Sequence, residues 1–261
     1  MRIVTFASGS SGNCTFIESG KTSILIDVGI SLRRLRADLS LCGKTPAELA
    51  AVFISHEHSD HVSGLASLVK NYPIPLYAPR TVAEHLRRTI PGVEVSLREM
   101  PVGEGVPVGE ITVRAFHTPH DTEESVGYRV EGDRVFALAT DMGCVTEEAE
   151  AALTGADAVL IEANHDPEML RTGPYPYYLK KRILSPQGHL SNGDCAALAA
   201  RLADSGTKAI LLGHLSRENN TPALAFSAVR AALADRETGL YVAPANESFS
   251  LEIGEGDYAC R

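Results

Sequence analysis

Three imidazoles and the carboxylate of Asp60 lie within the six residues from His56 to His61. They follow the apolar residues 50–54, which predict a buried strand. Imidazole and carboxylate are the groups that bind divalent zinc, manganese or iron in proteins. Together with ligands from elsewhere in the chain, this loop offers more donor groups than a single tetrahedral ion can bind. The spacing therefore predicts two ions side by side. A solvated polar loop would explain a single histidine, but it does not explain four such residues in this spacing.

The composition limits the kind of protein that can carry this loop. The chain has 261 residues, 44% of them hydrophobic, and a formal net charge of −9. Its length allows one large domain or two small ones, and no apolar run reaches the roughly 18 residues of a membrane span. The N-terminal residues lack the apolar core of a signal peptide, and the five cysteines show no CxxC spacing. We therefore expect a protein of the reducing cytoplasm, without disulfides, thiolate zinc or non-specific nucleic-acid binding.

Further histidines and carboxylates follow predicted strands, where the edge of a sheet would gather them. Asp27 ends the strand 23–27, and we expect it close to the metal loop. Ser59 is the predicted N-cap of a helix over residues 60–71. The polar residues 162–166 either orient a ligand imidazole or cap the next segment, and the sequence favours neither. The remaining candidates are His117 and His120 after the strand 111–116, Asp141 after 134–139, and His214 after 209–213.

Two other stretches offer groups for a substrate. The loop of residues 8–13 has backbone N–H groups and hydroxyls that can hold a phosphate, although chemistry alone favours a plain turn. Residues 169–193 contain no Asp or Glu and interleave basic with aromatic side chains, which suits a phosphodiester strand. A helix with a solvated basic face has the same pattern. The basic and aromatic residues are Arg171, Tyr175, Tyr177, Tyr178, Lys180, Lys181 and Arg182.

The His-x-His-x-Asp-His spacing resembles the signature of the metallo-β-lactamase-fold hydrolases. This resemblance implies an α+β or α/β protein with a four-layer αββα sandwich, in which residues 1–261 form a single domain. It also implies that a hydroxide held between the two ions is the nucleophile. The implied ligands are His56, His58 and His120 for the first ion and Asp60, His61 and His214 for the second, with Asp141 as the bridge. The implied catalytic residues are Asp60 and His189.

Several longer motifs resemble the WalJ (YycJ)-type subfamily, which is related to the ribonuclease Z and ribonuclease J nucleases. The resemblance favours a phosphate-facing role for the loop 8–13. Only about 70 residues separate Asp141 from His214, which leaves no room for an inserted clamp (β-CASP) domain. The motifs are the loop 8–13, His120-Asp121, Asn164-His165-Asp166, Gly188-His189-Leu190-Ser191-Asn192 and His214-Leu215-Ser216. The predicted substrate contacts are Ser8, Ser10, Ser11, Asn13, Lys180, Arg182 and Ser191.

These features together predict a metal-dependent phosphodiesterase, an exonuclease-type enzyme acting on DNA or RNA ends. The expected cofactors are two divalent metal ions: zinc, with manganese or iron as alternatives. The alternative function is hydrolysis of a small molecule, namely a cyclic phosphodiester, thioester or lactone. A non-catalytic scaffold is disfavoured, because the ligand set is complete. The sequence does not determine the substrate among these, the oligomeric state, or the roles of His117 and His165.

Overall fold

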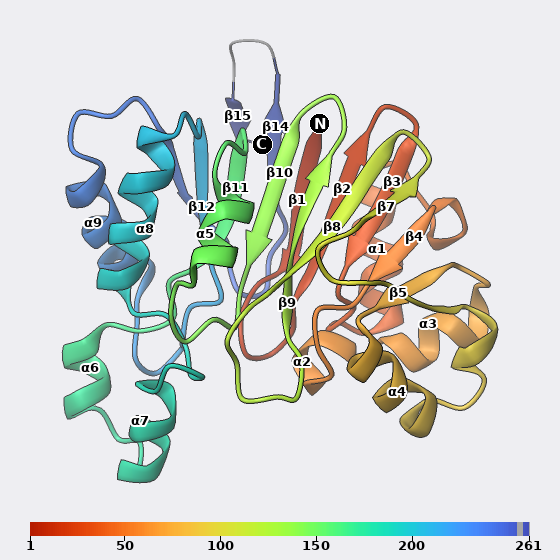
Figure 1. Ribbon diagram of the computed structural model, residues 1–261, viewed down its shortest axis with the longest axis horizontal. Helices are drawn as coiled ribbons and strands as arrows, with labels where there is room; N and C mark the ends of the chain where they lie inside the picture. Colours follow the sequence, from red (N-terminus) through yellow and green to blue (C-terminus); the bar gives the residue numbers. More distant parts are fainter. Residues whose placement is uncertain (255–257, 261) are drawn as a thin grey trace.

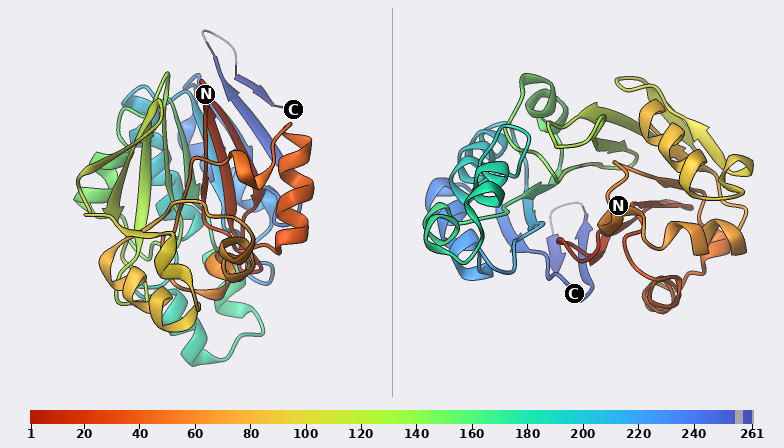
Figure 2. Two further views of the ribbon diagram at one scale, coloured as in Figure 1. Left: turned by 90° about the vertical axis from the view of Figure 1, so that its right-hand side faces the viewer. Right: turned by 90° about the horizontal axis from the view of Figure 1, so that it is seen from below.

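Two β-sheets lie face to face, with helices on their outer surfaces (Figures 1 and 2). The computed structural model describes residues 1–254 and 258–260. The first sheet runs in the order β15 (Tyr258–Cys260), β14 (Phe249–Ile253), β1 (Arg2–Ala7), β2 (Cys14–Ser19), β3 (Thr22–Ile26), β4 (Ala51–Phe53), β5 (Leu76–Ala78) and β6 (Leu97–Glu99). The second runs in the order β13 (Gly239–Val242), β12 (Ala209–Gly213), β11 (Ala158–Glu162), β10 (Val135–Ala139), β9 (Val126–Glu131), β8 (Ile111–His117) and β7 (Gly105–Val108).

Three layers of apolar side chains hold the sheets and helices together. The middle layer lies between the two sheets and includes Phe53 from the first and Tyr128 from the second. Strand β12 is apolar throughout because both of its faces are covered. Leu211 packs between the sheets, whereas Ile210 and Leu212 pack under the outer helices. A strand covered on both faces cannot alternate apolar with polar residues. This arrangement confirms the predicted αββα sandwich.

The outer helices are divided between the two sheets. One set packs on the first sheet and the other on the second, and short helices lie near the edge where the metal loop is found (Figure 1). Among the residues described, no helix combines the length and apolar content that a membrane span requires. The helices are α1 (Leu32–Leu41), α3 (Leu65–Asn71) and α4 (Arg80–Thr89) on the first sheet, α5 (Glu147–Leu153), α8 (Asn192–Asp204) and α9 (Pro222–Leu233) on the second, and the short α2 (Ser59–Val62), α6 (Pro167–Thr172) and α7 (Tyr177–Ile183).

Strand direction explains why distant residues meet at one edge. In the first sheet β3 and β4 are parallel, and β1 has the same direction because two antiparallel pairings separate it from β3. In the second sheet β10 to β13 are parallel, and β8 shares their direction through two antiparallel pairings. The segments that follow these strands therefore leave each sheet at the edge where its parallel strands have their carboxyl ends.

The helix predicted over residues 60–71 is two helices, and this prediction is wrong in detail. The chain forms α2 and α3 with a break at Ser63 and Gly64, and His58 rather than Ser59 is the N-cap of α2. A Cβ at Gly64 would collide with the carbonyl oxygen of Ile30, and the Gly64 N–H donates to the carbonyl of Val28 at 2.9 Å. The tertiary contact with the segment after β3 thus interrupts a pattern that looks continuous in sequence.

We expect Tyr128→Phe to lower the free energy of unfolding by about 1–3 kcal/mol. The Tyr128 hydroxyl is fully buried and donates to the carbonyl oxygen of Ile54 at 2.6 Å, joining the two sheets just before the metal loop. Denaturant unfolding measures the change. Tyr77→Phe is the matched control, because the Tyr77 ring packs in the same layer and stacks on Phe53, while its side chain is only partly buried. Equal effects of the two substitutions would contradict the prediction.

Candidate active site

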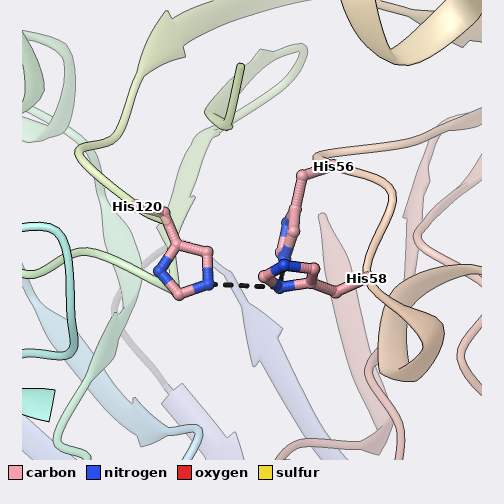
Figure 3. Close-up of side chains that lie close together, drawn as sticks. All are labelled: His56, His58 and His120. Carbon is pink, nitrogen blue, oxygen red and sulfur yellow. Dashed lines mark hydrogen bonds between the residues drawn. The ribbon is translucent and has the colours of Figure 1, made fainter. Parts of the chain in front are cut away.

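Three imidazoles from two sheets meet at this edge (Figure 3). His56 and His58 follow β4, and His120 follows β8. The Nε2 atom of His56 lies 3.2 Å from Nδ1 of His58, and Nε2 of His120 lies 3.3 Å from the same Nδ1 atom. Three nitrogen atoms at these separations can bind one metal ion together.

A second group of donors lies next to the first. Oδ2 of Asp60 lies 3.5 Å from Nε2 of His61 and 3.6 Å from Nε2 of His214. Asp60 and His61 belong to the first turn of α2, while His214 follows β12 on the opposite sheet. These three atoms can bind a second ion.

Asp141 lies between the two groups. Its Oδ2 atom is 3.1 Å from Nε2 of His61, and its Oδ1 atom is 3.5 Å from Nε2 of His214 and 3.6 Å from Nε2 of His120. A carboxylate in contact with ligands of both groups can share one oxygen with each of two ions. Asp141 is therefore the carboxylate that contacts imidazoles of both groups.

Most of these imidazoles also contact a partner through their other nitrogen atom. Such contacts fix the ring orientation and leave the inner nitrogen free for a metal, as is usual for metal-binding histidines. The contacts of the Nδ1 atoms are His56 with Ser55 Oγ at 3.0 Å, His61 with Asp27 Oδ2 at 2.7 Å, His120 with the Gly188 carbonyl at 3.1 Å, and His214 with Glu162 Oε1 at 2.7 Å. Asp27 thus lies beside the metal loop, as expected.

Glu162 belongs to the stretch 162–166, for which the sequence left two roles open. Its side chain is fully buried at the end of β11. Oε1 accepts from Nδ1 of both His189 (2.8 Å) and His214 (2.7 Å), and Oε2 accepts the backbone N–H groups of Met142 and Leu190. Burial opposes its ionisation, but the imidazoles of His189 and His214 together outweigh burial and lower the Glu162 pKa to about 2. Of the two roles left open for residues 162–166, both occur: Glu162 orients imidazoles, and Asp166 caps α6.

The donor set fits divalent cations. The buried atoms Nε2 of His214 and Oδ2 of Asp141 make no hydrogen bond with any residue in the described part of the chain. Burial opposes ionisation of Asp141, but the imidazoles of His214 and His61 hold its pKa well below its ordinary range. Burial likewise opposes protonation of His214, yet nearby carboxylates, that of Asp141 foremost, raise its pKa to about 10. The site is therefore one of negative potential that favours bound positive charge.

Three residues of the site adopt the left-handed backbone conformation. The φ angles are +60° at Asp27, +55° at Asp141 and +54° at His214, and each residue comes at or just after the end of a strand. Asp and His tolerate this region better than most residues, but each instance still costs on the order of 1 kcal/mol. Strain at three strand ends that converge on one centre is typical of a functional site.

The other histidines near the centre occupy different environments. His189 approaches both groups, with its ring centroid 5.1 Å from that of His120 and 5.3 Å from that of His214. His117 is exposed and pairs with Glu148 through Nδ1 at 3.1 Å. His165 is buried, and burial lowers its pKa. Of these three, only His189 belongs to a group of donors that could hold an ion.

The loop of residues 8–13 lies against the metal centre. The Asn13 amide nitrogen is 3.2 Å from Oδ2 of Asp60 and 3.0 Å from Nε2 of His61. Ser8 Oγ accepts the backbone N–H of His214 at 2.9 Å. Ser10 and Ser11 are exposed, and the Ser11 hydroxyl donates to Asn246 Oδ1. The loop therefore both supports ligands and presents hydroxyls to solvent.

The remaining predicted substrate contacts already have partners. Lys180 Nζ donates to the carbonyl oxygens of Arg171 and Gly173 at the end of α6. Arg182 pairs with Asp121, the residue after His120. The Ser191 hydroxyl accepts the N–H of Asp194 as the N-cap of α8. Lys180 and Ser191 thus have a structural use, while Arg182 ties α7 to the metal centre.

The fold and this edge of donors define a class of protein. Residues 22–215 match the family model described as the beta-lactamase superfamily domain. Exodeoxyribonuclease WalJ of Streptococcus pneumoniae is 38% identical over 240 residues, which cover 90% of this chain and 89% of the relative. Exodeoxyribonuclease YycJ of Bacillus anthracis is 36% identical over 238 residues with the same coverage. The chain therefore belongs to the metallo-β-lactamase superfamily and, within it, to the family of the WalJ and YycJ proteins, as its motifs predicted.

Solved structures show the same fold at lower sequence identity. Zn²⁺-bound PqqB from Methylobacterium extorquens superposes with a TM-score of 0.73 at 20% identity, covering 97% of this chain and all of that one. The short form of human tRNase Z superposes with a TM-score of 0.65 at 17% identity, with the same coverage. These likenesses confirm the arrangement of sheets and helices described above.

Proposed function

We propose that this chain is a two-metal exodeoxyribonuclease that hydrolyses phosphodiester bonds at the ends of DNA strands. The observation that carries the proposal is the pair of donor groups joined by Asp141, in a chain 36–38% identical over 90% of its length to two exodeoxyribonucleases. We propose His56, His58 and His120 as ligands of the first ion and Asp60, His61 and His214 as ligands of the second. Residues 1–261 would act as one domain.

The proposed ions are divalent, and zinc suits the mixture of imidazole and carboxylate, with manganese or iron as alternatives. Bound there, two such ions would activate a water as nucleophile and offset the charge of the phosphate. A cytoplasmic location fits the free cysteines Cys14, Cys42, Cys144 and Cys195.

His189 is the residue proposed to act on the scissile group. Its Nδ1 contacts the Glu162 carboxylate, which stabilises the protonated ring; burial opposes this, but Glu162 foremost raises the His189 pKa. The side chain is 21% exposed, whereas that of His214 is 2% exposed, so a substrate can reach His189. A protonated imidazole there would stabilise charge on a phosphate oxygen or donate a proton to the leaving oxygen. Asp60 is proposed to help position the attacking water.

Helix α7 offers a surface for the part of the DNA strand that lies beyond the scissile bond. Tyr177 and Tyr178 are 81% and 74% exposed, and Lys181 is exposed on the same short helix. Flat aromatic faces stack on bases, while the cation approaches phosphate. Because Arg182 pairs with Asp121, this surface is fixed next to His120.

The proposal is tested with end-labelled oligonucleotides. We expect the metal-loaded protein to release nucleotides stepwise from linear DNA, to leave covalently closed single-stranded circles of the same sequence intact, and to lose activity with a chelator. Linear RNA of the same sequence tests whether the protein distinguishes deoxyribose from ribose in its substrate. Turnover of thioesters or lactones without any cleavage of DNA or RNA would instead support the small-molecule hydrolase alternative.

A further inference from the structure

A cavity of about 510 Å³ lies beside the metal centre. It is bounded by the residues that follow β12 and β13 and by the start of β14, and its lining includes Leu215, Val242, Pro244 and Phe249. Because β12 and β13 are parallel, their carboxyl ends open at the same edge of the sheet as His214. The cavity is thus part of the same face of the molecule as the site.

One loop forms a wall shared by the cavity and the metal centre. Ser8 lines the cavity, and its Oγ accepts the backbone N–H of His214. At the other end of the loop, Asn13 contacts Asp60. A ligand in the cavity would therefore be separated from the proposed metal ligands by the thickness of the loop 8–13.

The lining suits a flat apolar group. Leu215, Val242 and Pro244 are aliphatic, and the partly buried Phe249 is held by Tyr241, whose ring centroid lies 5.7 Å away. Nucleobases stack on aromatic faces and are tolerated by aliphatic walls. The volume is within the range of cavities that hold a small molecule, which is about 300–1,000 Å³.

A cation stands at the rim of this cavity. Arg217 is exposed, and its Nη2 donates to Ser11 Oγ at 2.7 Å and to Asn246 Oδ1 at 3.2 Å. Both of these acceptors are neutral oxygen atoms. Its charge is therefore held in place by neutral groups and remains available to an anion such as phosphate.

The opposite flank of the metal centre has the reverse charge. A second cavity of about 390 Å³ beside His120 is lined by Glu123, Glu124 and Glu148. Three carboxylates disfavour a phosphate inside this cavity. Of the two cavities, the one beside Arg217 is electrostatically complementary to a nucleic-acid end.

We propose that the cavity beside Arg217 receives the unpaired terminal base of the DNA strand, with Arg217 contacting a phosphate of that end. This inference rests on the exonuclease function proposed above and adds to it the residues that recognise the end. Base stacking on Phe249 positions the last nucleotide, so that the adjacent phosphodiester reaches the metal centre. The predicted specificity is for ends that carry a free base.

The test compares two single-stranded oligodeoxynucleotides that are identical except at their termini. One has ordinary bases, and the other has abasic tetrahydrofuran residues at both ends. For the wild-type protein we expect KM to be about tenfold to a hundredfold higher for the abasic ends, with a smaller change in kcat. Phe249→Leu keeps apolar volume but removes the flat face. In this variant we expect the ratio of KM for abasic ends to KM for ordinary ends to fall toward one.

Arg217→Gln is expected to raise KM for the ordinary oligonucleotide about tenfold and to weaken its dependence on salt. Arg80→Gln, which removes an exposed arginine of α4 paired with Glu84, is the matched control and is expected to leave KM unchanged. Equal KM values for ordinary and abasic ends in the wild-type protein would overturn the assignment of the cavity to a terminal base. The exonuclease proposal would still hold. If neither oligonucleotide is cleaved, the exonuclease proposal fails and the cavity assignment fails with it.

Discussion

Asp141→Asn is expected to lower the rate of DNA hydrolysis by about 10³-fold or more and to reduce bound metal to one ion or fewer per chain. The carboxylate lies within 3.1–3.6 Å of ligand nitrogens from both groups, so it is the residue whose charge serves both proposed ions. Asparagine keeps the size and the tolerance of a left-handed backbone but not the negative charge. Losing several kcal/mol of charge stabilisation at the reacting phosphate corresponds to about three powers of ten in rate.

Metal analysis after dialysis and single-turnover cleavage together measure this effect. Asp204→Asn is the matched control, because that carboxylate is exposed and pairs with Arg236 away from the metal centre. We expect the control to retain the metal content and rate of the wild-type protein. An Asp141→Asn protein that keeps two ions and cleaves DNA within a few-fold of the wild-type rate would show that Asp141 is not the bridge.

Glu162→Gln is the second change with a large expected effect. The carboxylate accepts four hydrogen bonds, two from imidazoles and two from backbone N–H groups. A glutamine amide must turn its NH₂ group toward one of these two pairs of donors, which leaves buried donors facing each other. We expect about a 10–100-fold loss of metal affinity through His214 and a further loss of rate through His189.

Glu162 touches neither proposed ion, so its role as a positioning residue needs a separate readout. In Glu162→Gln saturated with metal, we expect kcat to fall with little change in KM and the alkaline limb of the pH–rate profile to move to lower pH, because the His189 ring loses its anionic partner. Glu150→Gln, at an exposed ion pair with Arg201, is the control. If only thermal stability changed, with kcat and the pH profile intact, Glu162 would be structural only.

The sequence predicted the metal loop and the fold because both depend on local patterns. Ligand types at fixed spacing after an apolar run identified His56 to His61, and buried strands alternating with helices fitted the αββα sandwich. His120, Asp141 and His214 were predicted through the family resemblance, and the structure brings all three to the same centre. The shared direction of β8, β10 and β12 is the physical reason that they meet.

The sequence could not predict features that depend on contacts between distant segments. Glu162 orients His189 and His214, which lie 27 and 52 residues further along the chain, and nothing in its neighbours distinguishes it from a capping residue. The break between α2 and α3 depends on the close approach of Gly64 to Ile30. Lys180 looked available for phosphate, but its ammonium group donates to two carbonyl oxygens of a neighbouring segment.

We propose above all that two cations bind on either side of Asp141. The most direct measurement is an anomalous difference map from crystals of the protein reconstituted with zinc or manganese, recorded at the absorption edge of the metal. We predict two peaks about 3.5–4 Å apart, one among His56, His58 and His120 and the other among Asp60, His61 and His214. A single peak at saturating metal, or peaks remote from Asp141, would contradict the account.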